Sequence, residues 1–350
     1  MIEDIRQKMR AIPGMDTLLE KEWALPWQKE LGRETVKRIF NGELERLRRR
    51  ILEGGDPASP EELRAALEKL LKAQGRCRLR PLLNATGVVI HTNLGRSRLA
   101  EEAIRAVRTV ASGYSNLEYD LEEGTRGQRN AHVEEALCAL AGAEAALVVN
   151  NNAGAVLLCL SALARGTEVI VSRGELVEIG GSFRVPDIME YSGALLVEAG
   201  TTNRTHLQDY ARAVTERTSM LLKVHPSNFR IEGFVAAPSR TDLAALARER
   251  GLLFMEDAGS GLLAEGSALG LEGETSVRTC LEEGVDIVTF SGDKMLGGPQ
   301  IGVIAGRKTA VDRLRGHPVL RALRVDKMTL AAFEATLRLY MKGNYDDIPV

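Results

Sequence analysis

The feature that most constrains the fold of this 350-residue chain is a regular alternation that begins near residue 80. From there on, short runs rich in β-branched residues are separated by amphipathic segments of about ten to fifteen residues with helical periodicity. The predicted strands cover residues 145–150, 168–172, 194–198, 220–225, 252–256, 286–290 and 301–305. Strands that alternate with helices predict an α/β fold, in which a mostly parallel sheet has helices on both faces.

The first 75 residues have a different pattern, because they read as helices throughout. A helix is expected to begin near Asp16, another to cover residues 34–52, and a third to open at Ser59-Pro60-Glu61-Glu62 after a break at residues 54–57. We therefore expect a small helical N-terminal domain over residues 1–75.

Charge is distributed unevenly between the two parts. Residues 1–80 hold 18 Lys and Arg against 14 Asp and Glu, although the formal charge of the whole chain is −2. Any contact with a polyanion is therefore expected to start at the N-terminal helices. The densest basic group is Arg46, Arg48, Arg49 and Arg50, for which a solvated helix face is the alternative interpretation.

Composition narrows the class of protein. The four cysteines form no CxxC pair and are expected to be reduced, which favours a cytoplasmic location. The first residues contain no apolar signal-peptide core, and no apolar run approaches the ~20 residues of a membrane span. The five histidines are scattered without ligand spacing, so no metal is expected.

Residues at the ends of predicted strands carry the candidate chemistry, because ligands of parallel α/β sheets bind there. After the strand at 145–149 come Asn151, Asn152, Ala153 and Gly154, which open a helix and offer backbone N–H groups to a phosphate. An Asn-rich turn without a ligand is the alternative. The strand at 252–256 is followed by Asp257 and then by glycines that allow close approach of a ligand.

The strongest run, FSGDKMLGGPQ at residues 290–300, directly follows a strand. Apolar surroundings lower the pKa of a lysine so placed, which makes Lys294 a candidate nucleophile for carbonyls; a surface lysine in a turn is the alternative. Taken in order, a phosphate-binding turn, a carboxylate and a lysine match the needs of pyridoxal phosphate.

Other sites fit less well. Residues 259–264 match GxGxxA, a fingerprint of dinucleotide-binding sites. They follow a late strand, however, and the acidic pair Glu256-Asp257 stands where the pyrophosphate would bind. No GxxxxGK[ST] run is present, and the HVE at residues 132–134 lacks the PCxxC of a zinc deaminase.

Several longer runs resemble the bacterial selenocysteine synthase family, the L-seryl-tRNA(Sec) selenium transferases. They are NATGVVIHTNLGR at 84–96, SRGELVEIGG at 172–181, GTTNRT at 200–205, SGDKMLGGPQ at 291–300 and RALRVDK at 321–327. The resemblance covers nearly the whole chain. It implies the fold of fold-type-I pyridoxal phosphate transferases, with a catalytic domain at residues 80–310. Members of that family continue well beyond Val350, so residues 311–350 are expected to begin a C-terminal small domain that is truncated here.

The resemblance also implies roles for individual residues. Lys294 would bind the cofactor covalently, Asp257 would pair with its ring nitrogen, and Ser291 with the turn at Asn151, Asn152, Ala153 and Gly154 would hold its phosphate. Asp293 belongs to the same catalytic run. Arg96, Arg321 and Arg324 would bind the selenium donor, with Arg321 and Arg324 one helical turn apart.

The implied reaction removes hydroxide from seryl-tRNA(Sec) and adds selenium from selenophosphate, giving selenocysteinyl-tRNA(Sec). The N-terminal arginines would contact the tRNA, and the implied assembly is a homo-oligomer, a ring of dimers that is a decamer in bacterial members. Two alternatives are a related pyridoxal phosphate lyase that acts on a small amino acid or amino sugar, and an RNA-binding paralogue without activity.

Overall fold

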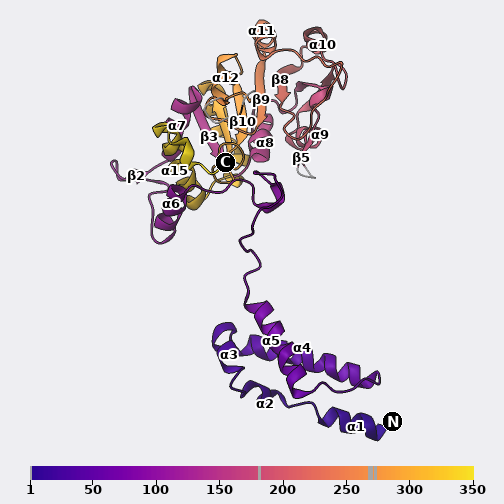
Figure 1. Ribbon diagram of the computed structural model, residues 1–350. Coiled ribbons are helices and arrows are strands. Elements are labelled where there is room, and N and C mark those ends of the chain that lie inside the picture. Colours follow the sequence, from indigo (N-terminus) through magenta and orange to yellow (C-terminus); the bar gives the residue numbers. More distant parts are fainter. Residues whose placement is uncertain (1, 180–182, 267–270, 272–273) are drawn as a thin grey trace. The chain divides into compact units, whose positions relative to one another are not determined.

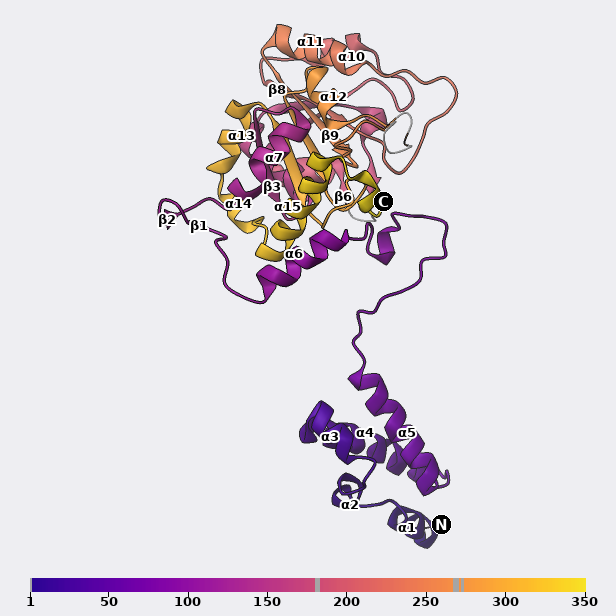
Figure 2. The ribbon, with the colours of Figure 1, turned by 60° about the vertical axis from the view of Figure 1, so that its left-hand side comes forward.

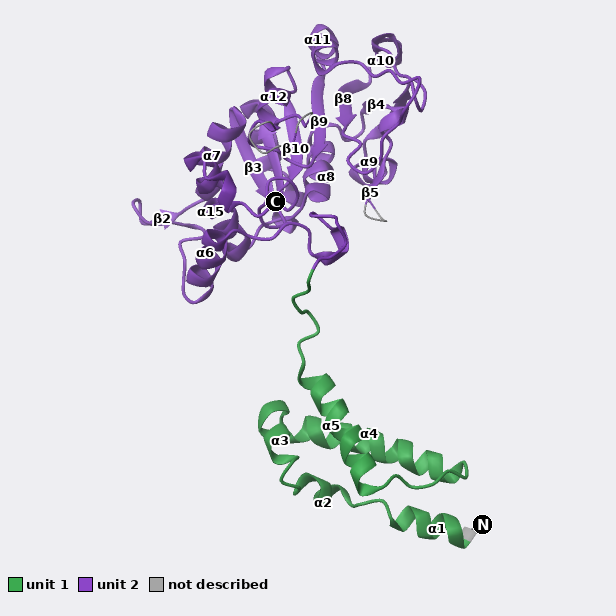
Figure 3. Ribbon diagram, in the orientation of Figure 1, with its two compact units in different colours: residues 1–83 green, residues 84–350 purple. Residues whose placement is uncertain are grey.

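A computed structural model describes residues 2–179, 183–266, 271 and 274–350, and it divides the chain into two compact units, residues 1–83 and 84–350 (Figure 3). The division lies a few residues beyond the boundary expected at 75–80. Each unit is described by itself. Within the described ranges, no helix is both long and apolar enough to cross a membrane.

The first unit is a helical bundle. Its long helix α4 buries Val36, Phe40, Leu44 and Leu47, a spacing of three and four that puts them on one face. Ser59 caps α5 with a capping box: its hydroxyl accepts from the Glu62 N–H at 3.2 Å. The helices are α1 (Ile2–Arg10), α2 (Met15–Leu19), α3 (Leu25–Leu31), α4 (Arg33–Leu52) and α5 (Pro60–Gly75).

The second unit is built on a seven-stranded sheet of order β3-β11-β10-β9-β8-β4-β7 (Figure 1). β11 runs antiparallel to β3 and β10, and the other neighbours are parallel, so the mostly parallel sheet is confirmed. All seven predicted strands are present, with ends shifted by up to three residues. They are β3 (Ala145–Val149), β4 (Glu168–Ser172), β7 (Leu195–Ala199), β8 (Thr218–Val224), β9 (Leu253–Gly259), β10 (Ile287–Ser291) and β11 (Gly302–Gly306).

Helices cover both faces of this sheet, as the sequence predicts (Figure 2). Alternate residues of β3 belong to different cores. Ala146 and Val148 belong to the core that includes residues of α6, α7, α11, α12 and α15, and Leu147 and Val149 to the core that includes residues of α8, α9 and α13. These helices are α6 (Glu101–Ala111), α7 (Ala131–Ala141), α8 (Asn152–Leu163), α9 (Val185–Ser192), α11 (Arg240–Arg250), α12 (Val277–Glu282), α13 (Lys308–Arg315) and α15 (Lys327–Lys342). The remaining elements include α10 (Leu207–Ala213), α14 (Pro318–Ala322) and the short strands β1 (Tyr119–Asp120), β2 (Thr125–Arg126), β5 (Glu178–Ile179) and β6 (Phe183–Arg184).

Residues 311–350 belong to the second unit. The Tyr340 hydroxyl in α15 donates to the carbonyl of Leu296 at 2.9 Å, so this segment packs on the loop that follows the predicted catalytic lysine. A separate C-terminal small domain stays a prediction. Of the motif at 172–181, residues 180 and 181 lie outside the described residues.

Candidate functional site

A cavity of about 290 Å³ lies at the carboxyl ends of the parallel strands. It is where a ligand site of such a sheet is expected, because helix N-termini and strand-end loops converge there. Its lining residues are Arg96, Asn151, Asn152, Ala153, Ile179, Phe183, His225, Asp257, Gly259, Ser291, Lys294 and Gln300. Most residues predicted to bind the cofactor therefore line one cavity.

Asp257 lies near the end of β9 and is 4% exposed. Its Oδ1 accepts from the Asn152 side-chain amide at 2.8 Å and from the Gly259 N–H at 3.1 Å. Burial raises the pKa of this carboxyl, and the two hydrogen bonds and the charge of Lys294 oppose that rise. A cationic partner at hydrogen-bond distance would favour the ionised form, and a protonated ring nitrogen is such a partner.

Lys294 lies three residues beyond the end of β10, on a tight loop in which Gly298 N–H donates to the Gly292 carbonyl at 2.8 Å. Burial lowers the pKa of its amine, Asp257 raises it, and Arg96 lowers it. An amine with a lowered pKa is neutral more often near pH 7 and is therefore more nucleophilic. Ser291, 5% exposed, ends the strand beside it.

Asp293 and Arg96 form an ion pair between segments 197 residues apart. Arg96 Nη1 lies 2.9 Å from one carboxylate oxygen of Asp293 and 3.1 Å from the other. Arg96 has a φ of 62°, in the left-handed region that a side chain rarely adopts. Backbone conformation and the buried Asp293 together hold the Arg96 guanidinium at the wall of the cavity.

The turn before α8 has the geometry of an anion site. Asn151 caps the helix, accepting from the Gly154 N–H at 2.8 Å, and the N-terminus of this twelve-residue helix opens on the cavity. The neighbouring strand must approach closely, because a Cβ at Gly302 would lie 2.1 Å from the Asn151 carbonyl oxygen. The turn is thus fixed by packing as well as by its cap.

Among the residues that the structure describes, two buried polar atoms of the cavity lining find no hydrogen-bond partner: Asn152 Oδ1 and His225 Nδ1. Buried polar atoms are rarely left unpaired in folded proteins, so both favour a polar ligand in this cavity. Together with a helix N-terminus, a buried carboxylate and a buried lysine, they fit a phosphate-bearing heteroaromatic cofactor such as pyridoxal phosphate.

Arg321 and Arg324 line a different cavity, of about 420 Å³, with Arg126, Arg129 and Arg315. A single chain therefore does not bring these two arginines into the cavity of Arg96. The expected helical turn between them is wrong, because α14 ends at Ala322 and leaves Arg324 outside the helix. Arg324 instead pairs with Glu118.

The four N-terminal arginines lie on α4 and are exposed. The Arg46 guanidinium lies 2.8 Å from the carboxylate of Glu43, and its side chain is 73% exposed. Both interpretations made from the sequence, a nucleic-acid contact and a solvated face, are compatible with this exposure.

Four lining residues have no role predicted from the sequence pattern: His225, Gln300, Ile179 and Phe183. A signal for His225 existed, since it is the last residue of a predicted strand. Its backbone N–H donates to the Asp257 carbonyl at 2.9 Å. Gln300 ends the lysine motif. Ile179 and Phe183 carry no comparable signal, because their position depends on how the segment after β4 folds back.

Comparison with known proteins gives a consistent picture. Residues 82–350 match the family model "L-seryl-tRNA selenium transferase", and residues 9–48 match "Selenocysteine synthase N terminal". An L-seryl-tRNA(Sec) selenium transferase of Geobacter sulfurreducens is 54% identical over 332 residues, which are 94% of this chain and 72% of that protein. One of Moorella thermoacetica is 52% identical over 339 residues, covering 96% of this chain and 71% of that protein.

Solved structures share the fold. D-glucosaminate-6-phosphate ammonia-lyase aligns with a TM-score of 0.61 at 24% identity, covering 78% of this chain and 70% of that one. An aspartate aminotransferase of Thermus thermophilus aligns with a TM-score of 0.52 at 19% identity, covering 71% and 64%. At these identities the likeness concerns the fold alone, and the fold is that of fold-type-I pyridoxal phosphate enzymes.

Proposed function

Since the chain belongs to the family of L-seryl-tRNA(Sec) selenium transferases, we infer that it converts seryl-tRNA(Sec) into selenocysteinyl-tRNA(Sec) with pyridoxal phosphate as its cofactor. The observation that carries this inference is the pairing of a buried carboxylate, Asp257, with a lysine of lowered pKa, Lys294, in one strand-end cavity.

The residues that would hold the cofactor surround that pair. Lys294 would bind it covalently, Asp257 would pair with its ring nitrogen, and Ser291 with the turn at 151–154 would hold its phosphate. When bound, pyridoxal phosphate supplies an electron sink that acidifies the α-proton of an amino acid. Asp257 sustains that sink, because an ionised carboxylate stabilises a protonated ring nitrogen.

The chain's own groups handle the protons. Lys294 would also be the group that accepts the α-proton, because burial lowers the pKa of its amine and favours the neutral form. The same group can return a proton to Cα after selenium has been added. Asp293 acts as a positioning residue, because its ion pair with Arg96 holds that guanidinium near Lys294.

We propose selenophosphate as the selenium donor, bound by guanidinium groups. Arg96 lines the cofactor cavity, while Arg321 and Arg324 line a separate arginine-rich cavity of the same chain. Guanidinium groups suit a phosphate-like anion, because they stay charged and bind two oxygens at once.

The active assembly in this proposal is a homo-oligomer, a decameric ring built from dimers. Apolar side chains are exposed at the end of the first unit and at the start of the second, namely Leu79, Leu82, Leu83, Val88 and Val89. Burial of such side chains against another copy stabilises an oligomer. The tRNA contact would be made by the arginines of α4, and the protein would act in the cytoplasm, where aminoacyl-tRNA is used.

The direct test is conversion. Purified protein, loaded with pyridoxal phosphate and mixed with seryl-tRNA(Sec) and selenophosphate, is expected to yield selenocysteinyl-tRNA, identified by mass spectrometry of the released amino acid. Seryl-tRNA(Ser) serves as the control substrate. Absence of product, together with lyase activity on a free amino acid or amino sugar, would assign the chain to the other enzyme class.

A further inference from the structure

A second cavity, of about 450 Å³, adjoins the cofactor cavity. It lies among the segments that follow β4, β7 and β8, and it shares His225 with the cofactor cavity. Its volume falls in the range of small-molecule sites, roughly 300–1,000 Å³. Among the described residues, only His225 lines both this cavity and the cavity that contains Lys294.

The walls of this second cavity are fixed by backbone contacts. A Cβ at Gly174 would lie 2.5 Å from the Thr202 carbonyl oxygen, so only glycine allows the two segments to approach. The Thr205 N–H donates to the Ala236 carbonyl at 2.8 Å, and the Asn203 side chain donates to the Phe234 carbonyl at 2.7 Å. These contacts fix the backbone of the segments that follow β4 and β7, which form part of the cavity wall.

One side of the cavity is apolar and includes an aromatic ring. Phe229, Ile231 and Val235 line it, and Phe229 and Val235 remain 41% and 46% exposed. Such a surface suits a planar ring system, because aromatic side chains stack on planar rings. Every nucleic-acid base has a face that can stack in this way.

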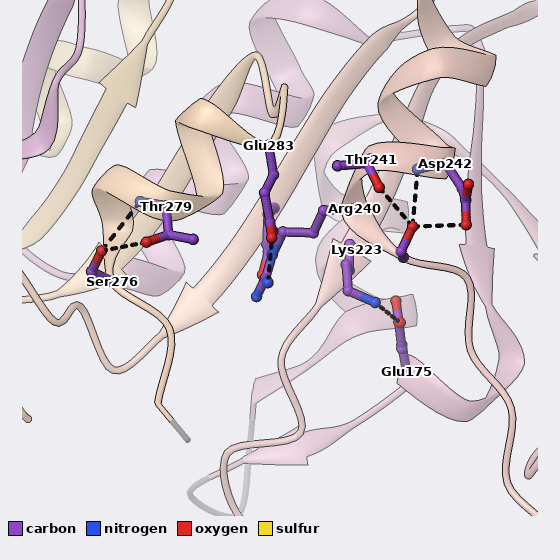
Figure 4. Close-up of polar contacts among 10 residues, drawn as sticks. Glu175, Lys223, Arg240, Thr241, Asp242, Ser276, Thr279 and Glu283 are labelled. Carbon is purple, nitrogen blue, oxygen red and sulfur yellow. Dashed lines mark hydrogen bonds and ion pairs between the residues drawn. The ribbon is translucent and has the colours of Figure 1, made fainter. Parts of the chain in front are cut away.

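Another part of the lining is polar and buried. The ammonium of Lys223 lies 3.0 Å from a carboxylate oxygen of Glu175, whose other oxygen accepts from the Val224 N–H at 3.0 Å (Figure 4). Burial raises the pKa of the Glu175 carboxyl. Burying two charges costs free energy, so a pair at the floor of a cavity favours a role in binding polar groups of a ligand.

The lining also contains an exposed arginine, Arg230. Its side chain is 84% exposed and lies beside Glu232. The site thus combines apolar side chains, a buried hydrogen-bonding ion pair and an exposed guanidinium that lies 2.8 Å from the carboxylate of Glu232. That combination matches a nucleotide, with its planar base, its polar base edge and its phosphate.

We propose that this cavity binds the 3′-terminal adenosine of the aminoacyl-tRNA while the esterified serine reaches Lys294 past His225. This proposal rests on the proposed function, in which the reacting serine is joined to the terminal ribose by a single ester. The nucleoside must therefore lie next to the cofactor cavity. Arg230 then faces the phosphate that precedes the adenosine.

The experiment compares two probes by calorimetry on the cofactor-loaded protein: serinamide, and the seryl amide of 3′-amino-3′-deoxyadenosine, which resists hydrolysis. The adenosine is expected to raise affinity at least about tenfold. Val235→Trp fills the cavity and should remove that gain while leaving serinamide binding unchanged. Phe234→Trp is the matched control, because Phe234 is 85% exposed and does not line the cavity. Phe229→Ala, at an exposed wall position, should reduce the gain without endangering the fold.

Equal affinity of the two probes for the parent protein overturns the assignment. So does an adenosine gain that survives both Val235→Trp and Phe229→Ala, or one that Phe234→Trp also removes. Failure of the proposed function has a different signature: seryl-tRNA(Sec) is then not converted at all, whatever the two probes show.

Discussion

The strand-end cavity and helix α4 both carry functional candidates with charged side chains, but the physical settings are opposite. Asp257 is 4% exposed and held by two hydrogen bonds, whereas the Arg46 side chain is 73% exposed and has one neighbouring carboxylate. Water cannot replace a missing partner in the first setting, and it readily does so in the second. Single substitutions should therefore act strongly in the cavity and weakly on α4.

The largest effect is expected at Lys294. Lys294→Ala removes the group proposed to bind the cofactor and to accept the α-proton, so conversion of seryl-tRNA(Sec) should fall by at least about 10³-fold. Borohydride reduction and peptide mass mapping of the parent protein should place the pyridoxyl group on Lys294. Lys308→Ala, an exposed position paired with Asp312, is the control. A pyridoxyl label on another lysine contradicts the assignment.

The next effect concerns Asp257. Asp257→Asn keeps the size of the side chain but cannot stabilise a protonated ring nitrogen, so exchange of the serine α-proton with deuterated water should slow by about 10²-fold. Mass spectrometry of recovered serine measures the exchange, and absorbance checks that cofactor is still bound. Exchange at a near-normal rate would show that another group pairs with the ring.

The pair Arg96–Asp293 offers a test by pH. The Lys294 pKa is lowered chiefly by burial, with Arg96 acting in the same direction and Asp293 against it. Only the neutral amine reacts with pyridoxal phosphate. Arg96→Gln should therefore raise the pKa of Lys294 and shift the rate profile of cofactor binding by apoprotein to higher pH.

Asp293→Asn should move the same profile to lower pH, because it removes a negative charge that favours the protonated amine. The visible absorbance of the bound cofactor, followed against time at each pH, reports both shifts. Movement of the two profiles in one direction would mean that the pair acts through packing instead of charge.

The smallest effects belong to α4. Each of the single variants Arg48→Gln, Arg49→Gln and Arg50→Gln should weaken tRNA binding by only about two- to fivefold. Loss of one guanidinium that binds a phosphate should also reduce the slope of log affinity against log salt concentration by about one. Cofactor absorbance should not change. Filter binding over a range of salt concentrations measures the effect, with Lys21→Gln on the α2–α3 connection as the control. If the three variants together leave affinity unaltered, α4 is a solvated face.

Local pattern by itself determined much of this protein. The capping box at Ser59, the seven strands, and the strand-end positions of Asn151, Asp257 and Lys294 all follow from spacing and residue type within short windows. Strand ends are predictable because hydrophobic runs stop where the backbone leaves the core. Functional residues at strand ends can be predicted from the sequence for the same reason.

Tertiary structure decided which of these ends meet. Strand order and the antiparallel direction of β11 depend on crossover connections, which no local window contains. For that reason the Arg96–Asp293 pair, 197 residues apart, could not be found from the sequence. The separation of Arg321 and Arg324 from Arg96, and the position of His225 between two cavities, depend in the same way on long-range packing, since neighbours along the chain do not specify neighbours in space.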